Sequence, residues 1–192
     1  MTEKVLLHVC CGPCALYPVA ALRREGFDLT GFFFNPNIHP YLEHQRRAQT
    51  LEQAADKLGL RMLPPEPYQI QDWLRAVCFR EQKRCEICYS LRLSETARRA
   101  RQGKFDYFST TILYSKFQKH ELARELAEAA AQEHQVKFLY RDFREGWKPG
   151  IELSLELGLY RQKYCGCVYS EQERFARAGL KSKERAGGTC RV

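Results

Sequence analysis

Seven of the nine cysteines in this 192-residue chain stand in three short groups. The first group lies in HVCCGPC (residues 8–14), the second is CEIC (85–88) and the third is CGC (165–167). Thiolates are soft ligands that favour zinc, copper(I) or iron–sulfur centres. The groups therefore predict a metal or redox site built from Cys10, Cys11, Cys14, Cys85, Cys88, Cys165 and Cys167.

The spacing within each group has a geometric meaning. Residues three apart at the start of a helix share one face, so both CEIC sulfurs can bind one metal centre. In CGC, the glycine allows the backbone to approach a bulky ligand closely. Successive extended residues point apart, so we expect Cys10 and Cys11 to serve two neighbouring centres and not one compact ion.

The number of grouped thiols limits the possible sites. One tetrahedral zinc site takes four ligands and two take eight, so seven thiols fit neither without another residue type. Seven do fit a four-iron cluster with four cysteines beside a second metal with three cysteines and a free position. They also fit a cluster with one open iron. An open position is what a reaction needs.

Other interpretations stay open for single motifs. CEIC alone fits a structural zinc site or a chance pair as well as a redox site. CCGPC resembles a redox dithiol. We interpret Cys78 as an ordinary buried thiol, Cys190 as a thiol of the tail, and His8 as a core histidine.

Short apolar runs alternate with helical segments. We expect strands at residues 5–9, 27–34, 60–63, 105–110 and 136–140. We expect helices at residues 18–26, 41–58, 73–77, 86–102 and 120–133, a loop at 110–118, and weaker patterns after Arg141. This order predicts an α/β fold with three layers and a mostly parallel sheet of about five strands. Ligands of such sheets bind beyond the carboxyl ends of the strands, where Cys10, Cys11 and Cys14 follow the first strand.

Composition indicates one α/β domain over residues 1–192, with a mobile tail from about residue 180. The first apolar run has only five residues, too few for a signal peptide or a membrane span. We therefore expect a cytoplasmic protein without a membrane partner, in which a disulfide framework is excluded. The formal net charge of +8 is compatible with a nucleic-acid partner.

Five motifs together resemble one known family. They are LLHVCCGPCALYP (6–18), CEICYSLRL (85–93), FSTTILYSKFQKH (108–120), DFREGW (142–147) and YRQKYCGCVYS (160–170). In this order they are similar to motifs of the cobalamin-independent epoxyqueuosine reductases, the QueH family. The joint match is far more specific than any one cysteine pair.

The resemblance implies a fold akin to the adenine-nucleotide alpha-hydrolases (HUP or Rossmann-like). It implies a [4Fe-4S] cluster with an additional mononuclear iron, no cobalamin, and metal ligands among the seven grouped cysteines. It does not say which thiol holds which metal. The implied reaction is the last step of queuosine synthesis, in which the epoxide of epoxyqueuosine in a tRNA anticodon loop is reduced to an alkene.

This reaction needs two electrons, two protons and the departure of water. A nicotinamide hydride would instead open the epoxide to an alcohol, and no GxGxxG follows a strand here. We therefore expect an open iron to act as Lewis acid on the epoxide oxygen, while the cluster passes on single electrons from an external donor protein. The candidate proton donors are His8, Tyr164 and Asp142.

Two other functions are considered. An ATP-dependent tRNA-thiolation-type enzyme would share the architecture, but its phosphate loop after the first strand is replaced here by CCGPC. A non-catalytic, zinc-stabilised RNA-binding module is the second. ATP consumption would identify the first, and a colourless protein with stoichiometric zinc the second.

A tRNA substrate requires phosphate contacts and base stacking. Candidates for phosphate contact are Arg46, Arg47, Arg84, Arg98, Arg99, Arg101 and Lys104, although a solvated helix face explains any single one equally well. Candidates for stacking on a splayed base are Tyr114, Phe117 and Trp147.

Overall fold

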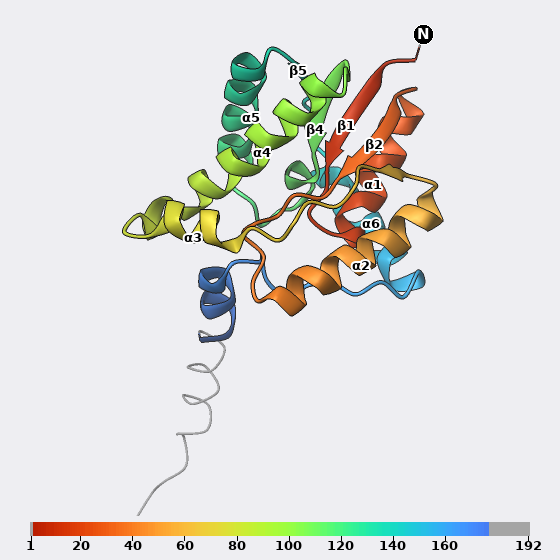
Figure 1. Ribbon diagram of the computed structural model, residues 1–192. Helices are drawn as coiled ribbons and strands as arrows, with labels where there is room; N and C mark the ends of the chain where they lie inside the picture. The colour runs from red at the N-terminus through yellow and green to blue at the C-terminus, as the bar shows by residue number, and fades with distance from the viewer. Residues whose placement is uncertain (1, 177–192) are drawn as a thin grey trace, which may run out of the picture.

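The computed structural model describes residues 2–176, which form a five-stranded parallel sheet flanked by helices (Figure 1). The strand order is β3-β2-β1-β4-β5, and every neighbouring pair is parallel. The strands are β1 (Lys4–His8), β2 (Asp28–Phe32), β3 (Arg61–Met62), β4 (Tyr107–Thr110) and β5 (Lys137–Phe138). This arrangement confirms the expected α/β fold class. Cys190 and the expected mobile tail lie outside the described residues.

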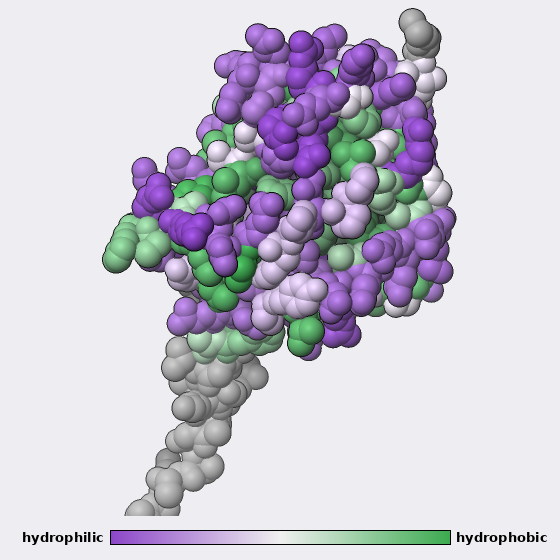
Figure 2. Space-filling view, in the orientation of Figure 1, coloured by the Kyte–Doolittle hydropathy of each residue, from purple (hydrophilic) through white to green (hydrophobic). Residues whose placement is uncertain are grey.

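The helices cover both faces of the sheet. α4 (Arg84–Gln102) packs against α5 (His120–His134) on one face, and α1 (Gly12–Arg24) packs against α2 (Tyr41–Leu58) and α6 (Trp147–Glu156) on the other (Figure 1). Val5, Leu6 and Leu7 of β1 are fully buried because both of its faces are covered. Hydrophilic side chains occupy most of the face shown in Figure 2. No helix among the described residues is long and apolar enough to cross a membrane.

The first helix begins earlier than the sequence pattern indicates. We expected residues 18–26, with Pro18 in the first turn, but α1 begins at Gly12 and Pro18 lies inside it. Pro13 occupies the first turn, where the missing N–H has no intrahelical partner to lose. The correction matters because it moves Cys14 from a loop into the first turn of a helix.

Two other elements differ from expectation. The expected loop at 110–118 begins with a 3-10 helix at Thr111–Tyr114, and α6 was not predicted. The buried residues of α6 are Gly150 and Ser154, which are not apolar enough to produce a helical hydrophobic pattern. The remaining short elements are α3 (Ile70–Val77), 3-10 helices at Glu81–Lys83 and Arg144–Gly146, and helical residues 168–176 at the end of the described chain.

Gly12 permits the close packing of α1 on α2 at the start of the first cysteine group. A Cβ atom placed on Gly12 would lie 2.5 Å from the backbone oxygen of Thr50. Backbone atoms cannot move away as a flexible side chain can, so any side chain here separates the two helices. The position of the first cysteine group therefore depends on a residue without a side chain.

We expect Gly12→Ala to lower the free energy of unfolding by about 1–3 kcal/mol, because overpacking outweighs the higher helix propensity of alanine. Urea unfolding followed by circular dichroism measures the change. Ser90→Ala, at an exposed position of α4, is the control and should change stability by less than about 0.5 kcal/mol. Equal stability of Gly12→Ala and the wild type would contradict the packing argument.

Candidate metal centre

Cys10, Cys11 and Cys14 converge at the carboxyl end of β1. Their sulfur atoms all lie within 4.8 Å of one another, and the Cys10 and Cys11 sulfurs are 3.8 Å apart. Two thiolates on one tetrahedral ion are about 3.8 Å apart when each metal–sulfur bond is about 2.3 Å. The three sulfurs therefore fit a single metal ion with one position left open.

This convergence corrects our expectation that the side chains of Cys10 and Cys11 point apart. The expectation assumed that strand geometry continues through both residues, but β1 ends at His8 and α1 begins at Gly12. Cys10 and Cys11 therefore lie in a turn, where successive side chains need not point to opposite sides as they do in a strand. It also returns Cys14 toward Cys10 and Cys11.

The three thiols of the first cysteine group have different pKa values, partly because they hydrogen-bond to one another. The thiols of Cys11 and Cys14 hydrogen-bond to Cys10 and hold its pKa well below the usual value. Burial raises the pKa of Cys11, and the hydrogen bond with Cys10 raises that of Cys14. A metal cation is the charge that would deprotonate these two thiols, as metal binding to cysteine requires.

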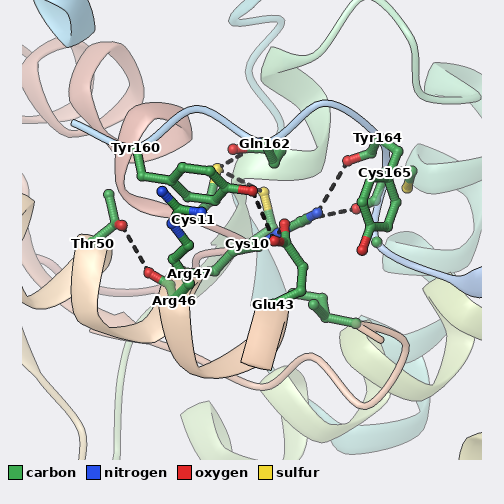
Figure 3. A network of polar contacts seen from close by, with 12 residues as sticks. Cys10, Cys11, Glu43, Arg46, Arg47, Thr50, Tyr160, Gln162, Tyr164 and Cys165 are labelled. Carbon is green, nitrogen blue, oxygen red and sulfur yellow. Dashed lines mark hydrogen bonds and ion pairs between the residues drawn. The ribbon is translucent and has the colours of Figure 1, made fainter. Parts of the chain in front are cut away.

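Gln162 adds a hydrogen-bond donor to this group. Its Nε2 lies 2.9 Å from the sulfur of Cys11 and 3.5 Å from that of Cys14 (Figure 3). Such outer contacts orient metal ligands and adjust their electron density. No sequence pattern indicated Gln162, which lies in an irregular segment.

Cys85 and Cys88 lie at the start of α4, as the CEIC spacing predicts. Cys88 is buried, and burial raises its pKa to about 12. Arg92 follows one helical turn later, with its Nη1 3.6 Å from the Cys88 sulfur. The sequence feature that points to this role is an arginine on the buried face of an amphipathic helix, one turn after the second cysteine of CEIC.

Arg92 connects the second cysteine group to the first. Its Nε lies 3.3 Å from Nε2 of His8, two residues before Cys10. Its charge acts on the thiols of Cys10, Cys88 and Cys165. One buried guanidinium thus lies within electrostatic reach of a cysteine from each of the three groups.

The third group is held by the backbone of a loop. Gly166 has φ +146°, and a Cβ atom there would lie 3.0 Å from Ile38 and 3.3 Å from Nη1 of Arg47. Arg47 donates to the carbonyl of Cys165 at 2.8 Å and to that of Tyr164 at 3.1 Å (Figure 3). The glycine of CGC is therefore required by backbone conformation and by close approach.

The charges of Cys165 and Cys167 both act on Cys88, so the second and third groups also lie near each other. Within residues 2–176, however, only Cys10, Cys11 and Cys14 form a group of three potential metal ligands within 4.8 Å. Each cysteine of a [4Fe-4S] cluster binds a different iron, so the ligands of such a cluster are spaced more widely than the ligands of one ion. Cys78 is exposed at the end of α3, not buried as we expected.

The three candidate proton donors lie in different environments. His8 is fully buried, and burial together with Arg92 lowers its pKa to about 3; its Nδ1 lies 2.9 Å from Oγ1 of Thr110. The hydrogen bond from Arg144 lowers the pKa of Asp142 to about 2, so this carboxylate is ionised at neutral pH. Burial raises the pKa of Tyr164 to about 12, and its hydroxyl donates to the carbonyl of His39 at 2.6 Å.

The basic residues expected to contact RNA do not form one surface. Arg47 is only 1% exposed and cannot reach a phosphate. Arg98 lies about 15 Å along the axis of α4 from Cys88, and Arg101 and Lys104 lie beyond it. Arg98 and Arg99 pair with Glu95, and Arg99 also pairs with Glu66. Arg84 lies near the cysteines and pairs with Glu173.

An open cavity of about 70 Å³ lies beside the first cysteine group. Cys14 and Gln162 contribute to its lining, together with Tyr114, Trp147 and Arg161.

The aromatic candidates for base stacking differ in exposure. Tyr114 is only 3% exposed, and its ring centroid lies 5.3 Å from that of Trp147. Phe117 is 85% exposed and meets Trp147 edge to face at 5.5 Å. Of the stacking candidates, Phe117 therefore offers the freest ring.

We expect Arg47→Met to lower the free energy of unfolding by about 3–5 kcal/mol, because Glu43 and two carbonyls lose a buried partner. Arg46→Met is the matched control on the same helix. Arg46 is exposed and lies over the ring of Tyr160, so its loss should change stability by no more than about 1 kcal/mol. Urea unfolding of both variants checks this difference, and equal effects would contradict the role of Arg47.

Comparison with known proteins agrees with this geometry. The family model described as "Epoxyqueuosine reductase QueH" matches residues 5–173. A protein of that name from Dehalococcoides mccartyi is 38% identical over 92% of this chain and 97% of its own length. Another of that name, from Thermotoga maritima, is 36% identical over 94% of this chain and 97% of its own length.

Among solved structures, a predicted subunit of tRNA methyltransferase from Methanocaldococcus jannaschii superposes with a TM-score of 0.56. It is 12% identical and the match covers 80% of this chain and 75% of that chain, which supports the fold alone. The family resemblance carried by the cysteine motifs is thus confirmed. This chain belongs to the QueH family of epoxyqueuosine reductases.

Proposed function

We propose that this protein is an epoxyqueuosine reductase that removes the epoxide oxygen of epoxyqueuosine in a tRNA anticodon loop and leaves the alkene of queuosine. The observation that carries the proposal is the convergence of Cys10, Cys11 and Cys14 beside an open cavity at the carboxyl edge of the sheet. We take the identity of the substrate from membership of the QueH family. The reaction makes the protein an oxidoreductase of tRNA processing, and we place it in the cytoplasm.

The spacing of the sulfurs supports one division of the ligands. Cys10, Cys11 and Cys14 would hold a single iron, because their sulfurs are close enough for one ion. The more widely spread groups would hold a [4Fe-4S] cluster through Cys85, Cys88, Cys165 and Cys167. This division uses all seven grouped thiols without cobalamin and leaves one position of the single iron for substrate.

When bound, the two iron centres supply Lewis acidity and single electrons, which an external donor protein replenishes. The chain itself supplies a nearby cavity and hydrogen-bond donors. Gln162 would hold the thiolates of Cys11 and Cys14 in place. Tyr114 and Trp147 would confine the cyclopentane ring of the substrate.

Tyr164 is the proton donor that we retain. Its hydroxyl keeps its proton at neutral pH and belongs to the residue next to Cys165. His8 is neutral and enclosed between Thr110 and Arg92, and Asp142 is already ionised. Neither of these two is suited to supply a proton near neutral pH.

Anaerobic preparation followed by metal analysis tests the proposed centres. We expect about five irons per chain, four inorganic sulfides and a broad visible absorption. Cys88→Ala should remove the cluster signal, whereas Cys78→Ala, at an exposed cysteine outside the groups, should leave it unchanged. A colourless protein with stoichiometric zinc would favour an RNA-binding module, and ATP consumption during turnover would favour a thiolation-type enzyme.

The tRNA should approach the exposed aromatic ring near the cavity. We expect Phe117→Ala to weaken binding of the anticodon stem-loop by about 1–3 kcal/mol, because a stacked base loses its partner. Leu155→Ala, at an exposed position of α6, is the control and should not change affinity. Fluorescence anisotropy measures both variants.

The same anisotropy assay, repeated at rising salt, tests the contribution of phosphate contacts. We expect affinity to fall steeply, since neutralised phosphates release counterions. The exposed cations near the cavity, Arg161 and Lys163, are the candidates that the geometry favours over Arg98, Arg99, Arg101 and Lys104. An affinity that is independent of both salt and Phe117 would contradict this mode of binding.

A further inference from the structure

The side-chain amide of Gln118 lies between a tyrosine and a cysteine of the third group. Its Nε2 is 3.3 Å from the sulfur of Cys165. Its Oε1 is 2.6 Å from the hydroxyl of Tyr89. The amide nitrogen is the end nearer to the sulfur, which lies 3.8 Å from Oε1.

Tyr89 fixes which end of the amide faces the sulfur. The hydroxyl oxygen of Tyr89 accepts a hydrogen bond from the backbone N–H of Lys119 at 3.2 Å. Its own proton is therefore free to be donated to Oε1 of Gln118. The reverse orientation would leave this buried proton without an acceptor and would place an amide oxygen against a thiolate.

The position of Tyr89 makes this arrangement rigid. Tyr89 is 3% exposed and follows Cys88 on α4, whereas Gln118 precedes α5. The contact thus joins the segment that carries the second cysteine group to the sulfur of the third. Three segments that are distant in the sequence meet at one amide.

We propose that Gln118 is a positioning residue that donates an N–H hydrogen bond to the Cys165 sulfur and thereby raises the reduction potential of the iron centre that Cys165 binds. Tyr89 holds the amide in the donating orientation. The inference rests on the proposed iron–sulfur function. Adding one electron makes the ligand sulfurs more negative, so an N–H donor stabilises the reduced state more than the oxidised state.

The strength of this hydrogen bond determines how much the amide should change the reduction potential. A hydrogen bond to a charged acceptor is stronger than one to a neutral acceptor, and the reduced and oxidised states differ by part of its energy. We expect Gln118→Leu to lower the equilibrium constant for one-electron reduction about tenfold, which corresponds to about 59 mV. Gln118→Glu should lower it further, because a carboxylate adds negative charge beside the sulfur.

The experiment is a dye-mediated redox titration of the full-length, iron-loaded protein, followed by electron paramagnetic resonance of the reduced state. Tyr89→Phe keeps every sulfur and the glutamine, so it should give a potential between those of the wild type and Gln118→Leu. Gln132→Leu, at an exposed position of α5, is the matched control and should titrate as the wild type does. Iron content and melting temperature are measured for each variant.

The outcomes separate the inference from the function on which it rests. A wild-type protein without an iron–sulfur signal would overturn the proposed function, and the inference with it. An iron-loaded wild type with the same potential as Gln118→Leu would overturn the inference alone. Loss of iron from Gln118→Leu with an unchanged potential in Tyr89→Phe would assign Gln118 a purely structural role, and would also overturn it.

Discussion

Arg47 makes the contact on which the third cysteine group depends. Its guanidinium joins Glu43 of α2 to the carbonyls of Tyr164 and Cys165, more than one hundred residues further along the chain. The loop around CGC has no strand or helix to satisfy these carbonyls. A buried carbonyl without a partner is unfavourable, so the planar, five-donor side chain of arginine is suited to this position.

The site must also compensate the negative charge of its buried thiolates. Several thiols lie together in a buried region, and burial alone opposes their ionisation. Arg92 counters this effect for cysteines of all three groups, and Gln162 and Gln118 direct N–H donors at the sulfurs of Cys11, Cys14 and Cys165. These groups surround the sulfurs with positive charge and N–H donors, which stabilise cysteine in the thiolate form that binds a metal.

The place of the site follows from the topology. The sheet continues from β1 to β2 and β3 on one side and to β4 and β5 on the other, so the strand order reverses at β1. Open α/β sheets bind their ligands in the crevice at such a point. In dinucleotide-binding α/β folds a phosphate loop follows the first strand. Here the same turn carries three thiols, so an unchanged scaffold supports a different chemistry through its loop residues.

The sequence by itself determined the strands, most helices and the grouping of the cysteines, because apolar runs, helical periodicity and thiol spacing are local properties. It could not determine that the sulfurs of Cys10 and Cys11 converge, because that depends on where β1 stops and α1 starts. Nor could it show that Arg47 is buried among carbonyls and that Gln162 and Gln118 face sulfurs. These contacts join residues far apart in the chain, so only the packing of the helices on the sheet decided them.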